Sequence, residues 1–481
     1  MAAGRLLGEV MARFGQPAIM GQLLAGVILG PSVLGALWPH GQHALFPDAP
    51  AQKSMLDGIS QFGILLLLLL TGMETDLKLV RKVGTAAVSV ALAGVAVPFA
   101  CGVALGEFLP ESLLPQANQR LLTALFLGTA LSISSIKIVA AIVRDMNFSR
   151  RDLGQVIISS AILEDTIGWI IIAVTLSLAQ AGHIDLKSAA RSVAGTAAFL
   201  AFSLTLGRRA VILLIRWSND HFASEFAVIT VILVIMGAMA LTTEAIGVNT
   251  VLGAFVAGVL IGESPILTDH IDEQLRGLIA AFFMPVFFGL AGLATDMSIL
   301  ANRELLLLAL GLIAIASIGK FAGAFVGGKI GGLRWREALA LGCGMNARGS
   351  TEVIVATIGL SMGAISQKLF SMIVAIAITT TMAMPPMLRW ALARVPMRKA
   401  ERERLEREEM EAKGFVPKLE RLLLAVDHSP NGKFAARLAG LVAGQRGIPI
   451  TVLSLVSQGD KTKPGKRRAK SAGEDTAKET A

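Results

Sequence analysis

The chain contains little of what soluble metal, redox and disulfide sites are built from. Its 481 residues include two cysteines and six histidines, and only 16% of the residues are charged. Cys101 and Cys343 lie singly inside apolar segments, without Cys-x-x-Cys spacing, and the histidines are scattered without the spacing of metal ligands. The sequence therefore predicts no disulfide, no resident metal, no redox role and no cofactor.

Apolar residues, by contrast, are abundant. They make up 54% of the chain, the mean hydropathy is +0.65, and there are 49 glycines. Apolar runs of about 20 residues recur along the sequence, which indicates a polytopic all-α protein of the lipid bilayer. The predicted spans are 18–37, 59–75, 83–108, 120–143, 153–180, 189–215, 224–243, 247–263, 275–295, 304–331, 337–361 and 366–393.

Residues 1–11 lack the long apolar core and the cleavage site of a signal peptide, so the spans are expected to serve as their own signals. Residues 2–13 are amphipathic and too short to cross, and we expect them to be the last turns of a truncated first helix. The net charge of +9 would suggest nucleic acid for a soluble protein. Here the Lys and Arg residues gather in alternate short loops, as at 78–82 and 144–151, so we expect no nucleic acid and a cytoplasmic C-terminus.

Glu164 and Asp165 lie in the middle of the apolar run 157–172. One acid at mid-bilayer costs roughly 2.5–3.5 kcal/mol on insertion scales, so two in succession indicate a function. A soluble active site is excluded because the flanking residues leave no polar face. An interhelical ion pair that only holds the bundle together stays open as an alternative.

Two of the spans are interrupted by polar residues. In a transporter, a matched pair of such interruptions predicts inverted repeats whose broken helices cross near the ion site. For one interruption alone, a serine-rich packing face would be the simpler interpretation. The polar residues are Thr129, Ser134, Ser135 and Lys137 in span 120–143, and Asn346, Arg348 and Glu352 in span 337–361.

Lys320 is the remaining charge inside an apolar run, and it is expected to face a carboxylate, with Glu164 and Asp165 as candidates. A role for Lys320 in holding helices together is the alternative. Two carboxylates, a lysine, hydroxyls and an unwound backbone suit a small monovalent cation, because hard cations prefer oxygen ligands. A carboxylate binds either a proton or the cation, so competition for it is a mechanism of exchange, with Lys320 as a second proton carrier.

The chain changes character after the last span. We expect a transmembrane domain over 1–397, a charged cytoplasmic helix and linker over 398–418, a βαβ unit over 419–457 and a disordered polar tail over 458–481. The βαβ unit resembles the opening of a universal stress protein domain, including its Ala425-Val426-Asp427 strand end. The Gly-rich phosphate loop of that family would lie further on, so no ATP site is predicted.

Residues 15–395 resemble the monovalent cation:proton antiporter superfamily, in the branch of bacterial sodium/proton antiporters, Kef-type potassium efflux proteins and plant cation/H+ exchangers. The resemblance implies an inverted-repeat antiporter fold with two crossed discontinuous helices, a homodimer that moves as an elevator, and a place in the bacterial inner membrane. The stretches that carry it are 21–31, 71–77, 127–131, Glu164-Asp165, 284–288, Gly319-Lys320 and 344–349.

The resemblance also assigns roles to residues. It implies that Asp165 is the cation and proton carboxylate, that Lys320 pairs with the first acid, Glu164, and that Ser134 and Ser135 are hydroxyls of the crossing. An acid at 164 is typical of electrogenic members. This sequence departs from the pattern at Glu164, which is one methylene longer than the usual aspartate, and at Lys137, where a small residue is usual. Lys137 either adds a second ammonium to the site or points away from it.

Three alternatives to a simple antiporter make different demands on the sequence. A regulated potassium efflux system would be expected to carry a nucleotide-sensing GxGxxG after a strand, and the tail has none. An intramembrane aspartyl protease needs a Gly-x-Gly-Asp stretch, which is missing, and Asp296 lies near a helix end. A membrane sensor that uses this fold without transport stays possible at the level of sequence.

Overall fold

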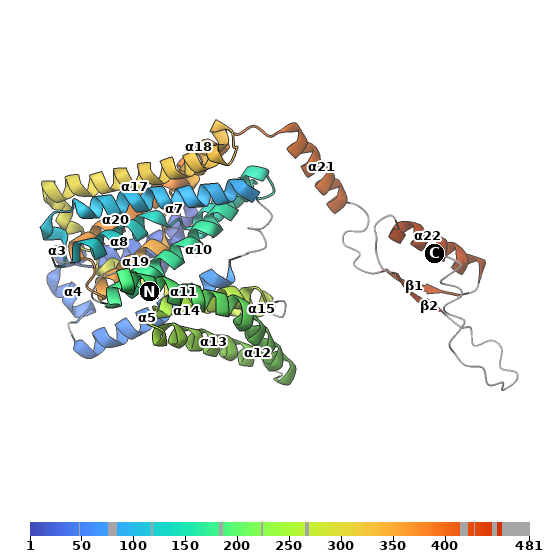
Figure 1. The fold of residues 1–481 in the computed structure, drawn as a ribbon, viewed down its shortest axis with the longest axis horizontal. Helices are drawn as coiled ribbons and strands as arrows, with labels where there is room; N and C mark the ends of the chain where they lie inside the picture. Colours follow the sequence, from blue (N-terminus) through green and yellow to red (C-terminus); the bar gives the residue numbers. More distant parts are fainter. Residues whose placement is uncertain are drawn as a thin grey trace. The chain divides into compact units, whose positions relative to one another are not determined.

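The computed structural model describes residues 1–47, 49–75, 84–116, 119–181, 186–222, 225–264, 269–413, 422–427, 429–444 and 450–454. The chain divides into two compact units, Met1–Pro396 and Met397–Ala481. Figure 1 shows the helices of the first unit and the small α/β segment of the second.

The first unit is entirely helical in its described residues. Its α-helices up to the first break are α1 (Ala2–Arg13), α2 (Ala18–Leu29), α3 (Leu34–Leu37), α4 (Pro39–Leu45), α5 (Pro50–Met73), α7 (Gly84–Glu107) and α8 (Arg120–Ser132). After it come α9 (Ile136–Asp145), α10 (Asp152–Ala181), α11 (Leu186–Phe202), α12 (Arg208–His221), α13 (Glu225–Ala245), α14 (Thr250–Gly262), α15 (Asp269–Leu278), α16 (Met284–Leu293), α17 (Arg303–Ile330), α18 (Trp335–Gly344), α19 (Ser350–Ser361) and α20 (Gln367–Leu392). Short 3-10 or π segments are η1 (Glu111–Leu113), η3 (Ser203–Gly207), η4 (Ile279–Phe283) and η5 (Met297–Ala301).

Nine helical segments within the described ranges are long and apolar enough to cross a bilayer. Each coincides with one of the twelve predicted spans. The other three predicted spans, 120–143, 247–263 and 337–361, contain apolar helices of 10 to 17 residues instead. Two of these three are the spans that polar residues interrupt, and there the chain forms two helices in place of one.

The two interruptions touch each other. The first separates α8 from α9 and the second separates α18 from α19. The backbone N–H of Ser135, in the first break, donates to the carbonyl of Ala347, in the second, at 2.8 Å. The all-α arrangement with two discontinuous helices in contact, expected from the sequence, is thus present in the first unit.

Close packing of α17 against α7 positions Lys320. The two helices lie side by side (Figure 1), because small residues let their backbones approach. A methyl group on Gly323 or Gly327 of α17 would overlap backbone atoms of Ala93 or Ser89 in α7. The Ser89 hydroxyl also donates to the Gly327 carbonyl at 2.9 Å. A lysine one turn from Gly323 therefore faces α7.

The second unit contains α21 (Lys399–Lys413), β1 (Leu422–Val426), α22 (Pro430–Gly444) and β2 (Ile450–Ser454). The strands are parallel, with Leu422 opposite Ile450 and Val426 opposite Ser454. The short α/β segment expected near the C-terminus is thus confirmed. The expected polar tail, 458–481, lies outside the described residues.

Candidate functional site

Glu164 and Lys320 form a fully buried ion pair between α10 and α17. The Lys320 Nζ lies 2.7 Å from Oε2 of Glu164, and both side chains have no exposed surface. The same Nζ donates to the carbonyls of Gly94 in α7 at 2.8 Å and of Ser132 at the end of α8 at 2.5 Å. An ammonium has three donors, and all three are used.

The two carbonyls that bind Lys320 are free to accept its hydrogen bonds because neither has a backbone N–H donor within its own helix. Pro98 lies inside α7 and has no N–H, so the carbonyl of Gly94, four residues earlier, lacks its helical donor. Ser132 is the last residue of α8, and the final carbonyls of a helix have no partner within it. Gly94 also makes room for Glu164, because a methyl group there would overlap Oε1. Sequence reasoning missed both Gly94 and Pro98, although a proline inside a span is a visible signal.

Ser134 connects the ion pair to the crossing of the broken helices. Its Oγ lies 2.6 Å from Glu164 Oε2 and 2.6 Å from the carbonyl oxygen of Met345, which follows α18. One hydroxyl has a single proton to donate, so it serves one of these acceptors at a time, unless Glu164 is protonated and donates to Oγ. The hydroxyl thus links the protonation state of Glu164 to the backbone of the second break.

Asp165 follows Glu164 along α10 and faces elsewhere. Successive helical residues are rotated by about 100°, and while Glu164 reaches toward α7 and α17, Asp165 lies near α19. The Thr351 hydroxyl is 3.5 Å from Asp165 Oδ1, and Asp165 is only 3% exposed. The two adjacent acids therefore occupy different surroundings, one beside a lysine and one beside the first turn of a broken helix.

Arg348, in the second break, binds groups on three neighbouring helices, α8, α17 and α19. Its guanidinium donates to the carbonyl of Ala130 at 3.3 Å, to the carbonyl of Ala316 at 3.0 Å and to Glu352 at 3.4 Å. The positive charge lies at the C-terminal end of α8, and Glu352 lies in the first turn of α19. Both arrangements oppose the partial charges that helix ends present.

The remaining predicted site residues have three different outcomes. Asn346 and Ser135 are buried in the breaks. Thr129, by contrast, donates to the Leu125 carbonyl at 2.7 Å and lies 3.3 Å from the Thr175 hydroxyl, so it binds α10 away from the two acids. Lys137 belongs to α9, and its side chain lies outside the described part of the structure.

The described side chains of this cluster carry three carboxylates and two cations, which leaves one net negative charge when all are ionised. Among the buried polar atoms of the described residues, Glu164 Oε1, Glu352 Oε2 and Asn346 Oδ1 have no hydrogen-bond partner. Oxygen acceptors without donors suit a proton or a small hard cation.

Buried charges at the contact of two interrupted helices are the architecture of an ion-coupled membrane transporter. The chain belongs to the sodium/hydrogen exchanger family, because the family model "Sodium/hydrogen exchanger, transmembrane" matches residues 2–394. It is accordingly an integral membrane protein and a cation/proton antiporter, and it is not an enzyme.

Relatives agree with this assignment. The Na(+)/H(+) antiporter NhaS4 of Synechocystis is 30% identical over 386 residues, which cover 80% of this chain and 93% of NhaS4. The Na(+)/H(+)-K(+) antiporter GerN of Bacillus cereus is 28% identical over 386 residues, covering 80% of this chain and 92% of GerN. The structure of the sodium proton antiporter MjNhaP1 from Methanocaldococcus jannaschii matches with a TM-score of 0.52 at 18% identity, covering 80% of this chain and 92% of MjNhaP1, which supports the fold.

Proposed function

We propose that the chain exchanges Na+ or K+ for H+ by alternating access, with Asp165 as the carboxylate that binds either the cation or a proton. The observation that carries the proposal is the buried Glu164–Lys320 pair at the contact of the two helix breaks, with Asp165 as the next residue. A carboxylate that is buried away from water is stable only when a proton or a cation is bound to it. Proton and cation then alternate there.

In this proposal the Glu164–Lys320 pair carries a second exchangeable proton. The pair lies beside Ser134, whose hydroxyl also reaches Met345 in the second break. Binding of a cation at Asp165 adds positive charge one residue away from the pair, which favours release of a proton from it. Two protons leaving for one cation entering would make exchange electrogenic.

The decisive experiment is an ion screen in proteoliposomes. Dissipation of an imposed pH gradient is measured after addition of Na+, K+ or Li+, and we expect Na+ or K+ to dissipate it. Asp165→Asn removes the ionisable group and should abolish the response to every ion, whereas Asp220→Asn, at an exposed position in α12, should leave it unchanged. An Asp165→Asn protein that still exchanges would defeat the assignment, and no response to any ion would favour the sensor alternative.

The role of Lys320 is tested separately. Lys320→Ala should change the coupling of exchange to the membrane potential more than it weakens cation binding, because it removes a proton carrier and leaves Asp165 in place. Exchange is compared with the potential clamped at zero and with the potential free. If the stoichiometry does not change, Lys320 is not in the proton path.

We further propose that two copies form a homodimer in the inner membrane of a bacterium, with the C-terminus in the cytoplasm and a partial universal-stress-protein-like unit after the linker. The family resemblance supports the dimer and the membrane, and the bias of Lys and Arg toward alternate loops supports the orientation. Light scattering of the detergent-solubilised protein tests the dimer. Protease access to residues 414–481 in right-side-out and inverted vesicles tests the orientation.

A further inference from the structure

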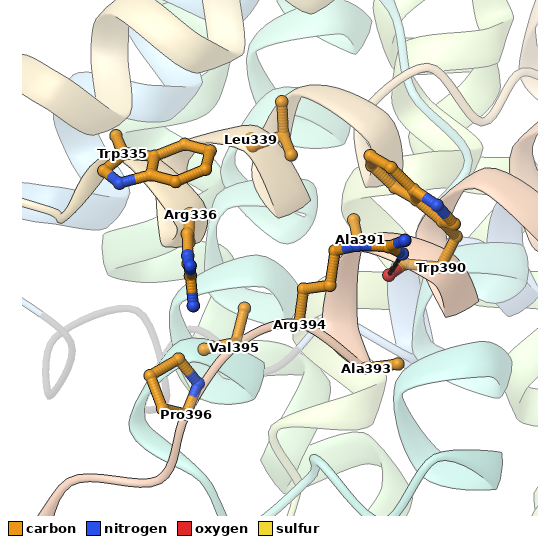
Figure 2. A pocket seen from close by; sticks show the side chains of 9 residues that line it. All are labelled: Trp335, Arg336, Leu339, Trp390, Ala391, Ala393, Arg394, Val395 and Pro396. Atoms are coloured by element: carbon orange, nitrogen blue, oxygen red, sulfur yellow. Dashed lines mark hydrogen bonds between the residues drawn. The ribbon is translucent and has the colours of Figure 1, made fainter.

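A hollow of about 570 Å³ lies in the first unit where α18 begins and α20 ends. Figure 2 shows Trp335 and Arg336 on one side of the hollow and Trp390 and Arg394 on the other. The hollow lies far along α18 from the ion site, because α18 begins at Trp335 and the second break follows its last residue, Gly344. The other lining residues are Leu339, Ala391, Ala393, Val395 and Pro396.

The position of the hollow along the helices places it at a membrane surface. One candidate span ends at Ile330, shortly before Trp335, and another ends at Leu392, between Trp390 and Arg394. Tryptophan is enriched where hydrocarbon meets headgroups, since its ring is apolar and its N–H is polar. Trp335 and Trp390 are 59% and 50% exposed. Their exposed rings therefore lie at the depth of lipid headgroups.

The two arginines have no anionic partner within the described part of the chain. Arg336 stacks its guanidinium 5.2 Å from the Trp335 ring, and Arg394 stacks 4.0 Å from the Trp390 ring. Arg394 also donates to the Trp390 carbonyl at 3.1 Å. The nine lining residues include no acid. The rings thus hold two positive charges over a hollow that offers nothing to neutralise them.

We propose that this hollow binds the phosphate headgroup of an anionic phospholipid from the adjacent leaflet. Guanidinium groups match phosphate oxygens in geometry and charge, and basic pockets at helix ends select anionic lipids over zwitterionic ones. The apolar wall of Leu339, Val395 and Pro396 suits the first methylene groups of the acyl chains. A bound headgroup joins the start of α18 to the end of α20, two helices that already pack together.

The test uses tryptophan fluorescence of the full chain in vesicles. Trp38→Phe and Trp217→Phe leave Trp335, Trp390 and the buried Trp169. A minor share of brominated phosphatidylglycerol or brominated phosphatidylcholine is added to phosphatidylcholine vesicles, and quenching is measured. We expect roughly a tenfold preference for phosphatidylglycerol, because two cations near the surface both attract it. Equal quenching by the two lipids would overturn the proposal without need of any arginine variant.

Two further comparisons identify the residues and the ligand. Arg336→Gln with Arg394→Gln should abolish the preference, whereas Arg209→Gln with Arg216→Gln, which removes the same charge from exposed positions of α12, should keep it. A preference that survives the first pair of substitutions overturns the site. Excess soluble glycerol phosphate should leave the quenching unchanged. If it abolishes the preference, the hollow binds free phosphate esters, and the lipid assignment is wrong.

Discussion

Gly94 of α7 is the residue with the least room beside the ion pair. The carbonyl of Gly94 accepts from Lys320, and a side chain at this position would overlap Oε1 of Glu164. A single residue therefore contacts both members of the pair, through its backbone and through the absence of a side chain. Pro98 also acts indirectly. It has no backbone N–H, so the Gly94 carbonyl is free to accept a hydrogen bond from Lys320.

Gly94→Ala should lower exchange strongly. The added methyl group overlaps Glu164 Oε1, and overpacking in a well-packed core costs about 1–3 kcal/mol. The measurement is the rate of pH-gradient dissipation together with the melting temperature of the purified protein. Combining the substitution with Glu164→Asp withdraws the carboxylate by one methylene, so we expect this double variant to recover part of the rate.

The matched control for this substitution is Gly237→Ala in α13. A methyl group there meets nothing within 4 Å, and alanine in a helix gains about 1 kcal/mol over glycine. We expect full exchange and an unchanged or raised melting temperature. Equal loss of activity in Gly94→Ala and Gly237→Ala would contradict the steric explanation.

The sequence predicts the charged residues of the site, and it does not predict those that act through the backbone. Glu164, Asp165 and Lys320 are visible because ionisable groups in apolar runs are costly, and the structure brings Glu164 and Lys320 together. Gly94 and Ser132 act through backbone carbonyls, which every residue has. Thr129 looked like the other hydroxyls of its span, but it faces Thr175. The direction of a hydroxyl depends on which helix packs there.

At the scale of elements, the two helix breaks hold each other by hydrogen bonds. The Ser135 N–H binds the Ala347 carbonyl, and the Ser134 hydroxyl lies within reach of the Met345 carbonyl. The polar interruptions in the sequence predicted both breaks, because residues such as Ser134 and Arg348 are poor members of a lipid-facing helix. Which carbonyl pairs with which donor could not be predicted, since the pairing depends on where the two interrupted segments cross.

Ser134→Ala should impair exchange more than it impairs stability. Removing the hydroxyl deprives Glu164 and Met345 of a shared donor, and a buried acceptor left without a partner costs about 1–3 kcal/mol. Thr123→Val is the control, because Thr123, in the adjoining helix α8, donates to the Ala364 carbonyl at 2.8 Å away from the breaks. We expect similar losses of melting temperature in the two variants. A similar loss of exchange in both would count against a special role of Ser134.

At the scale of the whole molecule, the chain divides into two compact units, Met1–Pro396 and Met397–Ala481. The family match ends at residue 394, close to the boundary between them. The second unit has one parallel strand pair and one helix, and its helix exposes Phe434, Leu438 and Leu441 by 70%, 55% and 73%. So small an α/β unit buries little apolar surface, which limits its own stability.

Ending the chain at Lys413 should therefore leave exchange intact. The first unit retains its helices and its buried cluster, and α21 is preserved. The measurement is the initial rate of exchange per amount of reconstituted protein, compared with the full chain over a range of pH. A lost rate at unchanged melting temperature would show that the second unit regulates the first.

The Lys320 ammonium has three hydrogens, and each is donated to one of three oxygen acceptors. Once the lysine is a neutral amine it retains two hydrogens for three oxygens, and its lone pair must face one of them at a distance of 2.5 to 2.8 Å. Transfer of the hydrogen to Glu164 keeps every contact favourable, because the carboxylic acid then donates to the amine. Departure of the hydrogen to water leaves two electron pairs in opposition, and one of the helices α7, α8 or α10 must draw back. We therefore expect a helix shift to accompany loss of the hydrogen from the Glu164–Lys320 pair as a whole, and not its transfer from one member of the pair to the other.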